Sequence, residues 1–253
     1  MIHLLRNQLG SIRSVYLPGN QINRQDDFAD FPETVLLLHG FFQTRNIWQV
    51  MEKRLRQHNY GVLSLNLGGF LWRYNTRSIL AQSEWLAEKI THIRDKHCLD
   101  KLHIIGHSMG GLVARHCVQS CGGSEHVKSL ITLGSPHHGT PTALIGIGLM
   151  AGGLLSRSPF QMLPQSKLIQ NLQQESWPAD IQLCSVFSTQ DLICPWWCSV
   201  LRKGPKEEHI QNIKLRNIGH TELASHPKIF QLVLSNLNAQ SKKHELELRH
   251  ETT

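Results

Sequence analysis

Short apolar runs, each followed by glycine or polar residues, recur along most of the chain. Several of them are continuous rather than alternating, as in residues 34–38 (TVLLL), and such runs are typical of strands that are buried on both faces of a parallel sheet. The expected strands cover residues 34–38, 61–67, 102–105, 127–133, 181–188 and 213–218.

Helical patterns fill the intervals between these strands. In Ser78–His97, apolar residues recur at steps of seven, four and three, which forms one stripe of an amphipathic helix. Further helices are expected over residues 43–55, 112–119 and 229–237. The alternation of strands and helices predicts an α/β fold with a mostly parallel, doubly wound sheet and helices on both faces.

Residues 141–179 interrupt this alternation. Leucine, isoleucine and glycine dominate the first half of this stretch, and prolines and a second helical pattern follow. We expect an insertion that forms a lid over the edge of the sheet where ligands bind, because its apolar character suits a pocket cover or a surface that meets lipid. An ordinary packed helical hairpin is the alternative interpretation.

The chain divides into three parts on this basis. Residues 1–33 are polar and irregular and are expected to form an N-terminal arm, residues 34–237 form the main domain, and residues 238–253 form a charged C-terminal tail. A length of 253 residues suits a single domain of this class.

Composition and charge limit the classes of binding partner that we expect. The formal net charge is +7, but the basic residues form small groups without a nucleic-acid motif, so nucleic acid is not expected and anionic lipid or substrate fits better. The sequence contains no apolar run of 18 residues and no signal-like leader, which predicts a cytoplasmic protein with, at most, peripheral membrane contact. Its six cysteines are expected to be reduced thiols rather than zinc ligands.

The central motif is Gly106–Gly110 (GHSMG), a G-x-S-x-G between an apolar strand and a helical segment. This context predicts a nucleophile elbow, with Ser108 at its tip. Gly106 and Gly110 supply the small residues that a close approach of strand and helix requires. Outside this context, the pattern would be a glycine-rich turn with an incidental serine.

A serine nucleophile needs a base, and the base needs a group that orients it. Doubly wound hydrolases supply these in the order Ser, Asp or Glu, then His. Asp191 follows the strand after the insertion, and His220 follows the last strand. We therefore predict a catalytic triad of Ser108, Asp191 and His220, since Asp180 precedes its strand and Glu222 is too close to His220 in sequence.

Backbone N–H groups must stabilise the oxyanion, and those of Phe41 and Met109 are predicted to do so. Four further histidines lie at strand ends: His39, His107, His137 and His138. We expect His107, His137 and His138 to hydrogen-bond loop backbone or to line the pocket. A metal site is not expected, since no carboxylate or cysteine completes the cluster.

Several motifs together carry a family resemblance. They are His39-Gly40-Phe41, GHSMGG at 106–111, GSPHHGT at 134–140, Asp191 with Pro195-Trp196, SPF at 158–160, MLP at 162–164, and Gly219-His220. Over residues 34–237 the chain resembles the bacterial lipases and esterases of the α/β-hydrolase superfamily, the triacylglycerol lipases among them. The resemblance implies carboxylic-ester substrates, the triad named above and no organic cofactor.

The expected function is therefore that of a serine hydrolase, a lipase or esterase that acts through an acyl-enzyme on a small-molecule or lipid ester. An acyltransferase or amidase would use the same acyl-enzyme and transfer it to another acceptor. A non-catalytic binding protein of the same fold is the alternative from another class.

Overall fold

The computed structural model describes residues 27–68, 76–205 and 207–251, so most of the predicted arm and the end of the tail lie outside the described residues. Within this part, six strands form one sheet in the order β2-β1-β3-β4-β5-β6, and all neighbours are parallel. The strands are β1 (Glu33–Leu38), β2 (Tyr60–Leu65), β3 (Leu102–His107), β4 (Val127–Leu133), β5 (Gln182–Ser188) and β6 (Ile210–Leu215). The predicted doubly wound α/β fold is confirmed.

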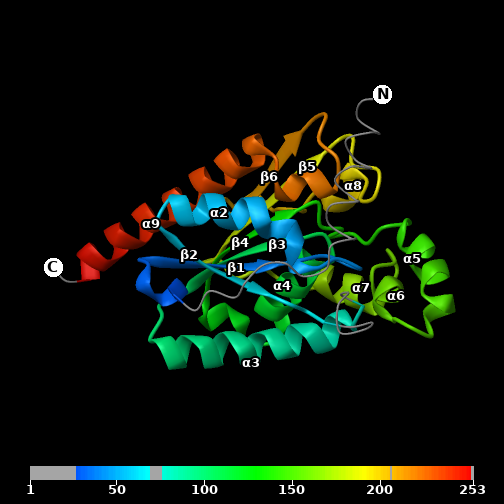
Figure 1. The fold of residues 1–253 in the computed structure, drawn as a ribbon, viewed down its shortest axis with the longest axis horizontal. Coiled ribbons are helices and arrows are strands. Elements are labelled where there is room, and N and C mark those ends of the chain that lie inside the picture. The colour runs from blue at the N-terminus through cyan, green and yellow to red at the C-terminus, as the bar shows by residue number, and fades with distance from the viewer. Residues whose placement is uncertain (1–26, 69–75, 206, 252–253) are drawn as a thin grey trace.

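Helices cover both faces of the sheet (Figure 1). The main ones are α2 (Gln49–Gln57), α3 (Ile79–His97), α4 (Met109–Ser120) and α9 (Pro227–Glu251). Short 3₁₀ turns precede or follow them: η1 (Asp27–Asp30), η2 (Arg45–Trp48), η4 (Gly123–Glu125) and η6 (Thr221–Ala224). In Figure 1, α3 and α4 lie below the sheet, and α2 and α9 lie above it.

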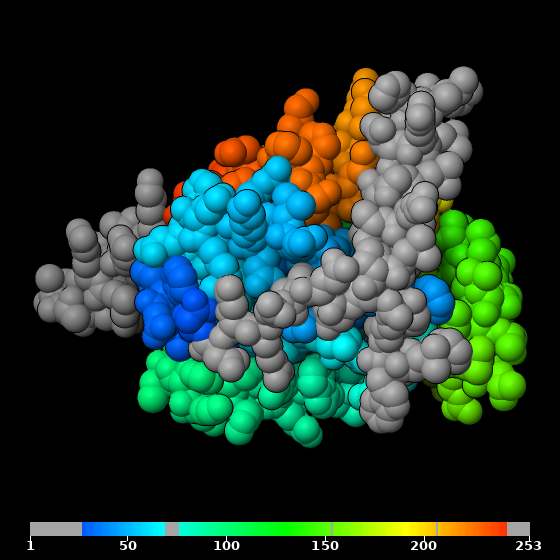
Figure 2. Space-filling view, in the orientation of Figure 1, coloured from blue at the N-terminus to red at the C-terminus, as the bar shows by residue number. Residues whose placement is uncertain are grey.

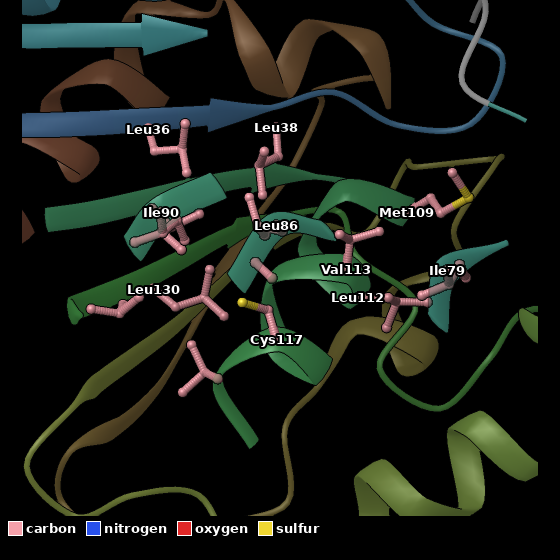
Figure 3. Packing of buried hydrophobic residues seen from close by; sticks show 14 of the residues in the cluster. Leu36, Leu38, Ile79, Leu86, Ile90, Met109, Leu112, Val113, Cys117 and Leu130 are labelled. Carbon is pink, nitrogen blue, oxygen red and sulfur yellow. The ribbon is translucent and has the colours of Figure 1, made fainter. Parts of the chain in front are cut away.

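The alternation of side chains along each buried strand separates the core into two layers. On one face, Leu36 and Leu38 of β1 belong to the cluster that includes Leu86 and Ile90 of α3 and Val113 of α4 (Figure 3). On the other face, the cluster contains Val35, Leu37, Ile105, Met51 of α2 and Val233 of α9. Both faces of the central strands are therefore buried, which is why their apolar residues form continuous runs instead of alternating with polar ones.

The last strand begins three residues earlier than predicted, at Ile210 rather than Ile213. β6 is an edge strand, and its side chains are mostly exposed or half-buried. Since few of its positions enter the core, its apolar pattern is a weak guide to its register. The strand boundary predicted for residues 213–218 was therefore wrong.

The last helix differs more. It begins at Pro227, a residue favoured at the first helical position, and continues to Glu251 instead of ending at Leu237. Its extension is rich in Lys, Glu and Leu, which are good helix formers. The first turn beyond residue 237 is also attached to the domain, because Tyr60 Oη donates to Asn238 Oδ1 at 2.9 Å.

The described end of the predicted arm packs on the domain. Phe28 in η1 is buried, and its carbonyl accepts a hydrogen bond from Thr34 Oγ1 at 3.2 Å. A Cβ atom on Gly61 would lie 2.0 Å from the same carbonyl oxygen, so β2 must carry glycine where η1 crosses it.

The interrupting segment, residues 141–179, contains α5 (Ala143–Leu149), η5 (Ala151–Gly153), α6 (Ser158–Gln161) and α7 (Lys167–Gln174). In Figure 1, α5 and α6 form one end of the molecule, beyond the sheet, and Figure 2 shows the same end in green. None of the described helices combines the length and the apolar character that crossing a membrane requires. The cytoplasmic location stays a prediction.

The two halves of this segment are attached differently. Three side chains of α4 hold the C-terminal end of α7: Arg115 Nη2 donates to Leu172 O (2.5 Å), Gln119 Nε2 to Glu175 O (2.7 Å) and Ser120 Oγ to Glu175 Oε2 (2.6 Å). The bonds from Arg115 and Gln119 satisfy backbone carbonyls that a helix end leaves unpaired, and the bond from Ser120 adds a contact to the Glu175 carboxylate. By contrast, Leu149 in α5 is 70% exposed and Leu154 is 86% exposed.

Candidate functional site

The turn between β3 and α4 consists of Ser108 alone. The strand ends at His107, the helix begins at Met109, and Ser108 has φ 53° and ψ −123°. A positive φ is strained for serine, at about 1–3 kcal/mol. The N–H of Ser108 donates to Leu133 O of β4 at 2.9 Å, which anchors this conformation to the sheet.

The two glycines of the motif are required by close backbone contacts. A Cβ atom on Gly106 would lie 2.6 Å from Gly111 Cα, and one on Gly110 would lie 2.4 Å from Leu38 O. Side chains at these positions would force α4 away from β1 and β3. The predicted close approach of strand and helix is confirmed, and it lifts Ser108 clear of the sheet.

Asp191 and His220 are in contact, although β6 separates them in sequence. His220 Nδ1 lies 2.6 Å from Asp191 Oδ2, which is short for a nitrogen–oxygen hydrogen bond and typical of a charge-assisted one. The other carboxylate oxygen, Oδ1, accepts hydrogen bonds from the N–H groups of Ile193 (2.9 Å) and Cys194 (2.8 Å). An imidazole that donates from Nδ1 keeps Nε2 as a proton acceptor.

This pair lies beside the elbow. The imidazole rings of His220 and His107 have centroids 4.6 Å apart, and His107 directly precedes Ser108. A Cβ atom on Gly134, at the end of β4, would lie 3.1 Å from Asp191 Oδ2. The carboxyl ends of β3, β4 and β5 thus meet at one place, where a parallel sheet binds ligands.

The loop after β1 forms a tight turn against the elbow. Gly40 N donates to Gln43 Oε1 at 2.8 Å, and Gln43 N donates to Gly40 O at 3.3 Å. Phe41 and Phe42 lie at the tip, and Phe42 has a positive φ of 54°. A Cβ atom on Gly40 would lie 2.9 Å from Ser108 Cβ, so the turn that carries the Phe41 N–H lies next to the serine.

Met109 supplies the other predicted donor. It is the first residue of α4, and the first N–H groups of a helix have no intrahelical acceptor. The helix also places its positive end at Ser108. The roles of Phe41 and Met109 as oxyanion donors stay predictions.

Of the other histidines, His138 contacts loop backbone, as predicted, whereas His137 contacts a hydroxyl group of β4. His39 Nε2 accepts from Leu67 N at 3.2 Å, and burial lowers the pKa of His39 to about 4. His137 Nε2 contacts Thr132 Oγ1 (2.9 Å), and His138 Nε2 donates to Val200 O (2.7 Å). Burial also lowers the pKa of His137 well below its ordinary value. These histidines are neutral structural groups near neutral pH.

The possible metal ligands and the cysteine thiols of the described residues were the other candidates for chemistry. Among the described residues, no group of three or more His, Cys, Asp or Glu side chains has an arrangement that could hold a metal ion. All six cysteines are free thiols, and burial raises the pKa of Cys117 and of Cys184 to about 12.

Gln43 also belongs to the site, although its sequence context predicted only the start of a helix.

Comparison with known proteins decides the family. The model of the alpha/beta hydrolase fold family matches residues 33–193, more than half of the chain. The chain belongs to the α/β hydrolase fold family. The matched region includes Ser108 and Asp191, and His220 lies beyond it.

Individual relatives match only part of the chain. A triacylglycerol lipase of Pseudarthrobacter phenanthrenivorans is 27% identical over 124 residues, which are 47% of this chain and 37% of that protein. One from Burkholderia plantarii is 27% identical over the same length, or 33% of that protein. The matched part of the chain thus spans about a third of the length of these two relatives.

Solved structures match more widely at lower identity. The mature Bacillus licheniformis lipase BlEst2 superposes with a TM-score of 0.66 and 15% identity, and covers 87% of this chain and 96% of that one. Aspergillus fumigatus lipase B gives 0.64 and 14%, with 87% of this chain and 55% of that one covered. At such identities the likeness shows the hydrolase fold.

Proposed function

We propose that this protein hydrolyses carboxylic esters through an acyl-enzyme, with Ser108 as nucleophile, His220 as general base and Asp191 as the group that orients the base. The observation that carries the proposal is the 2.6 Å contact between His220 Nδ1 and Asp191 Oδ2, held next to a serine in the strained elbow conformation. A serine, an imidazole and a carboxylate in this order are the parts that acyl transfer needs.

In the first half of the reaction, Ser108 Oγ attacks the acyl carbon while His220 Nε2 takes the hydroxyl proton. The N–H groups of Phe41 and Met109 stabilise the oxyanion. The ester C–O bond then breaks, and His220 donates the proton to the departing alcohol. In the second half, water attacks the acyl-enzyme by the same route, which releases the carboxylic acid and restores Ser108.

Two relatives named triacylglycerol lipase support triacylglycerols as the substrate class, and the surface around the site fits such apolar esters. Exposed apolar side chains gather on α5, after η5, on the loop after β5 and on the short helix α8 (Trp196–Ser199): Leu144, Ile145, Leu149, Leu154, Leu192, Ile193 and Trp197. Thr142 Oγ1 donates to Ile193 O at 2.5 Å, so the two segments are neighbours. Residues 139–156 contain no charged side chain.

We therefore propose that α5 and η5 act as a lid and that this face rests on a lipid aggregate or membrane surface while the site is in use. Large apolar patches on a soluble protein mark such contacts, and tryptophan suits the interface between water and lipid. Arg115, Gln119 and Ser120 attach α7 to α4. In our proposal, α5 and η5 are therefore the part of the segment that moves.

The central test combines a serine-directed fluorophosphonate with hydrolysis of p-nitrophenyl esters. We expect covalent labelling of the protein and release of free acid, and loss of both in Ser108→Ala, with kcat reduced by about 10³-fold or more. Ser235→Ala, at an exposed position on α9, is the matched control and should keep full activity. Absence of labelling, or labelling that persists in Ser108→Ala, would refute the proposal.

A further inference from the structure

We propose that His107 is a positioning residue of this site and that it fixes the backbone of the base by donating a hydrogen bond from Nε2 to the carbonyl of His220. This inference deepens the proposed function and rests on it. It assigns a role to the histidine of the G-x-S-x-G motif, a position that the hydrolysis mechanism itself does not use.

His107 is fully buried between the oxyanion turn and the base. Its Nε2 atom lies 2.9 Å from His220 O, and its Nδ1 atom lies 3.0 Å from Gln43 Oε1. Its ring is tilted by 54° against the ring of His220. On another side, the ring of Trp48 approaches edge-on with a centroid distance of 6.4 Å. A side chain enclosed in this way has little freedom to change its contacts.

The contacts decide which nitrogen carries the proton. Burial lowers the pKa of His107 well below its ordinary value, so the ring is neutral and has one N–H group. Gln43 Oε1 already accepts the N–H of Gly40 at 2.8 Å. The His220 carbonyl receives only a long hydrogen bond of 3.3 Å from Leu223 N among the backbone donors of the described residues. Gln43 Oε1 and His220 O are both acceptors, so either tautomer leaves one ring-nitrogen lone pair facing an oxygen. We assign the proton to Nε2, because Gln43 Oε1 already has a donor at 2.8 Å, whereas the buried His220 carbonyl has only the long one.

The consequence is that the base is held at two points. Asp191 holds the imidazole through Nδ1, and His107 holds the backbone of the same residue. Since His107 directly precedes Ser108 in the chain, the second attachment ties the base to the turn that carries the nucleophile. Misplacement of a catalytic group by about 1 Å can reduce the rate by about 10²-fold, so this contact should matter for kcat.

Two amide variants separate the nitrogens of His107. In His107→Gln, the side-chain NH₂ reaches the position of Nε2 and can still donate to His220 O. In His107→Asn, the shorter side chain places its NH₂ near the position of Nδ1, on the Gln43 side. We expect His107→Gln to keep kcat for a p-nitrophenyl ester within about threefold, and His107→Asn to lose about 10- to 100-fold with KM unchanged. The rate of fluorophosphonate labelling should fall in parallel with kcat.

His137→Asn is the matched control, because His137 is also buried but contacts Thr132 and Arg115 rather than the base. It should lower the melting temperature without the loss in kcat. Equal kcat in the two His107 variants, or losses that follow the melting temperature in all three, would overturn the inference.

A measurement on the unaltered protein avoids dependence on the folding of a variant. The ¹⁵N chemical shifts of the His107 ring report which nitrogen is protonated, and we expect the proton on Nε2. A proton on Nδ1 would overturn the inference while ester hydrolysis stands. Failure of the unaltered protein to label or to hydrolyse esters would instead refute the proposed function.

Discussion

Asp191 makes three hydrogen bonds, and its two carboxylate oxygens serve different purposes. The bonds from the N–H groups of Ile193 and Cys194 fold the loop after β5 around the side chain. The bond to His220 Nδ1 selects the tautomer in which Nε2 accepts a proton. A neutral amide of the same shape could preserve the loop hydrogen bonds through its oxygen, but it would face His220 Nδ1 with an NH₂ donor in place of an acceptor.

We predict that Asp191→Asn lowers kcat by about 10⁴-fold, the magnitude seen when the same change was made in another serine hydrolase triad. The melting temperature should change little, because the loop hydrogen bonds survive through the amide oxygen. Asp180→Asn is the control, since Asp180 lies on the surface near Lys101, at the opposite edge of the sheet. Equal activity in both variants would remove Asp191 from the site.

Among individual residues, the sequence predicts the proposed catalytic groups better than it predicts the hydrogen bonds that hold them in place. Ser108, Asp191 and His220 could be named because a motif and a chain-order rule point to them. The bond from Gly40 N to Gln43 Oε1, and the contact of His107 with His220 O, could not be predicted. They join positions that are far apart in sequence or depend on the exact shape of a loop, and no periodicity marks them.

At the scale of elements, the two halves of the interrupting segment, residues 141–179, differ in how they pack on the domain. α7 has a buried face with Leu168, Ile169 and Leu172 and is bonded to α4, whereas α5 buries only Ala143 among its residues. The second half is packed on the domain, as the hairpin interpretation expects, and the lid that we propose is confined to the first half. Composition alone predicted an apolar insertion, but it could not show which half the core would hold.

We predict that Leu149→Gln on α5 reduces hydrolysis of emulsified long-chain esters several-fold and leaves hydrolysis of dissolved p-nitrophenyl acetate unchanged. Leu149 is 70% exposed, so its replacement should not disturb folding. Leu80→Gln on α3 is the same change at an exposed leucine that lies beside Glu84 and His116 rather than among the exposed apolar residues of α5, and it should leave both rates unchanged. Equal effects of Leu149→Gln on both substrates would argue against a lipid-facing role for α5.

Taken as a whole, the molecule buries several histidines in the neutral form. The pKa of His39 falls to about 4, because burial disfavours its charged form. In the unfolded chain His39 titrates near its ordinary value of 6.5, so between pH 6.5 and 4 the unfolded state binds more protons. Stability is therefore complete above pH 6.5 and declines as the pH falls towards 4, by about 3 kcal/mol for this residue.

We predict that urea titrations of the unaltered protein between pH 7 and 4 show this decline and that His39→Gln reduces it, while the buried His107 and His137 sustain the remainder. Glutamine can still accept the N–H of Leu67 through its amide oxygen, and it does not titrate. His92→Gln, at an exposed position on α3, should reproduce the decline of the unaltered protein. A pH dependence identical in all three would show that His39 is not the source.

The positive φ of Ser108 has a bearing on how any inactive form of the protein should be made. Alanine at this position deletes the oxygen but keeps Cβ, and with it the steric conflict between side chain and backbone. Glycine would delete both, and the relaxed turn would leave an inactive protein that is sturdier than the original. Ser108→Ala is therefore the better inactive variant for ligand binding and for comparisons of folding. The difference in unfolding free energy between Ser108→Gly and Ser108→Ala would measure the backbone strain at this position.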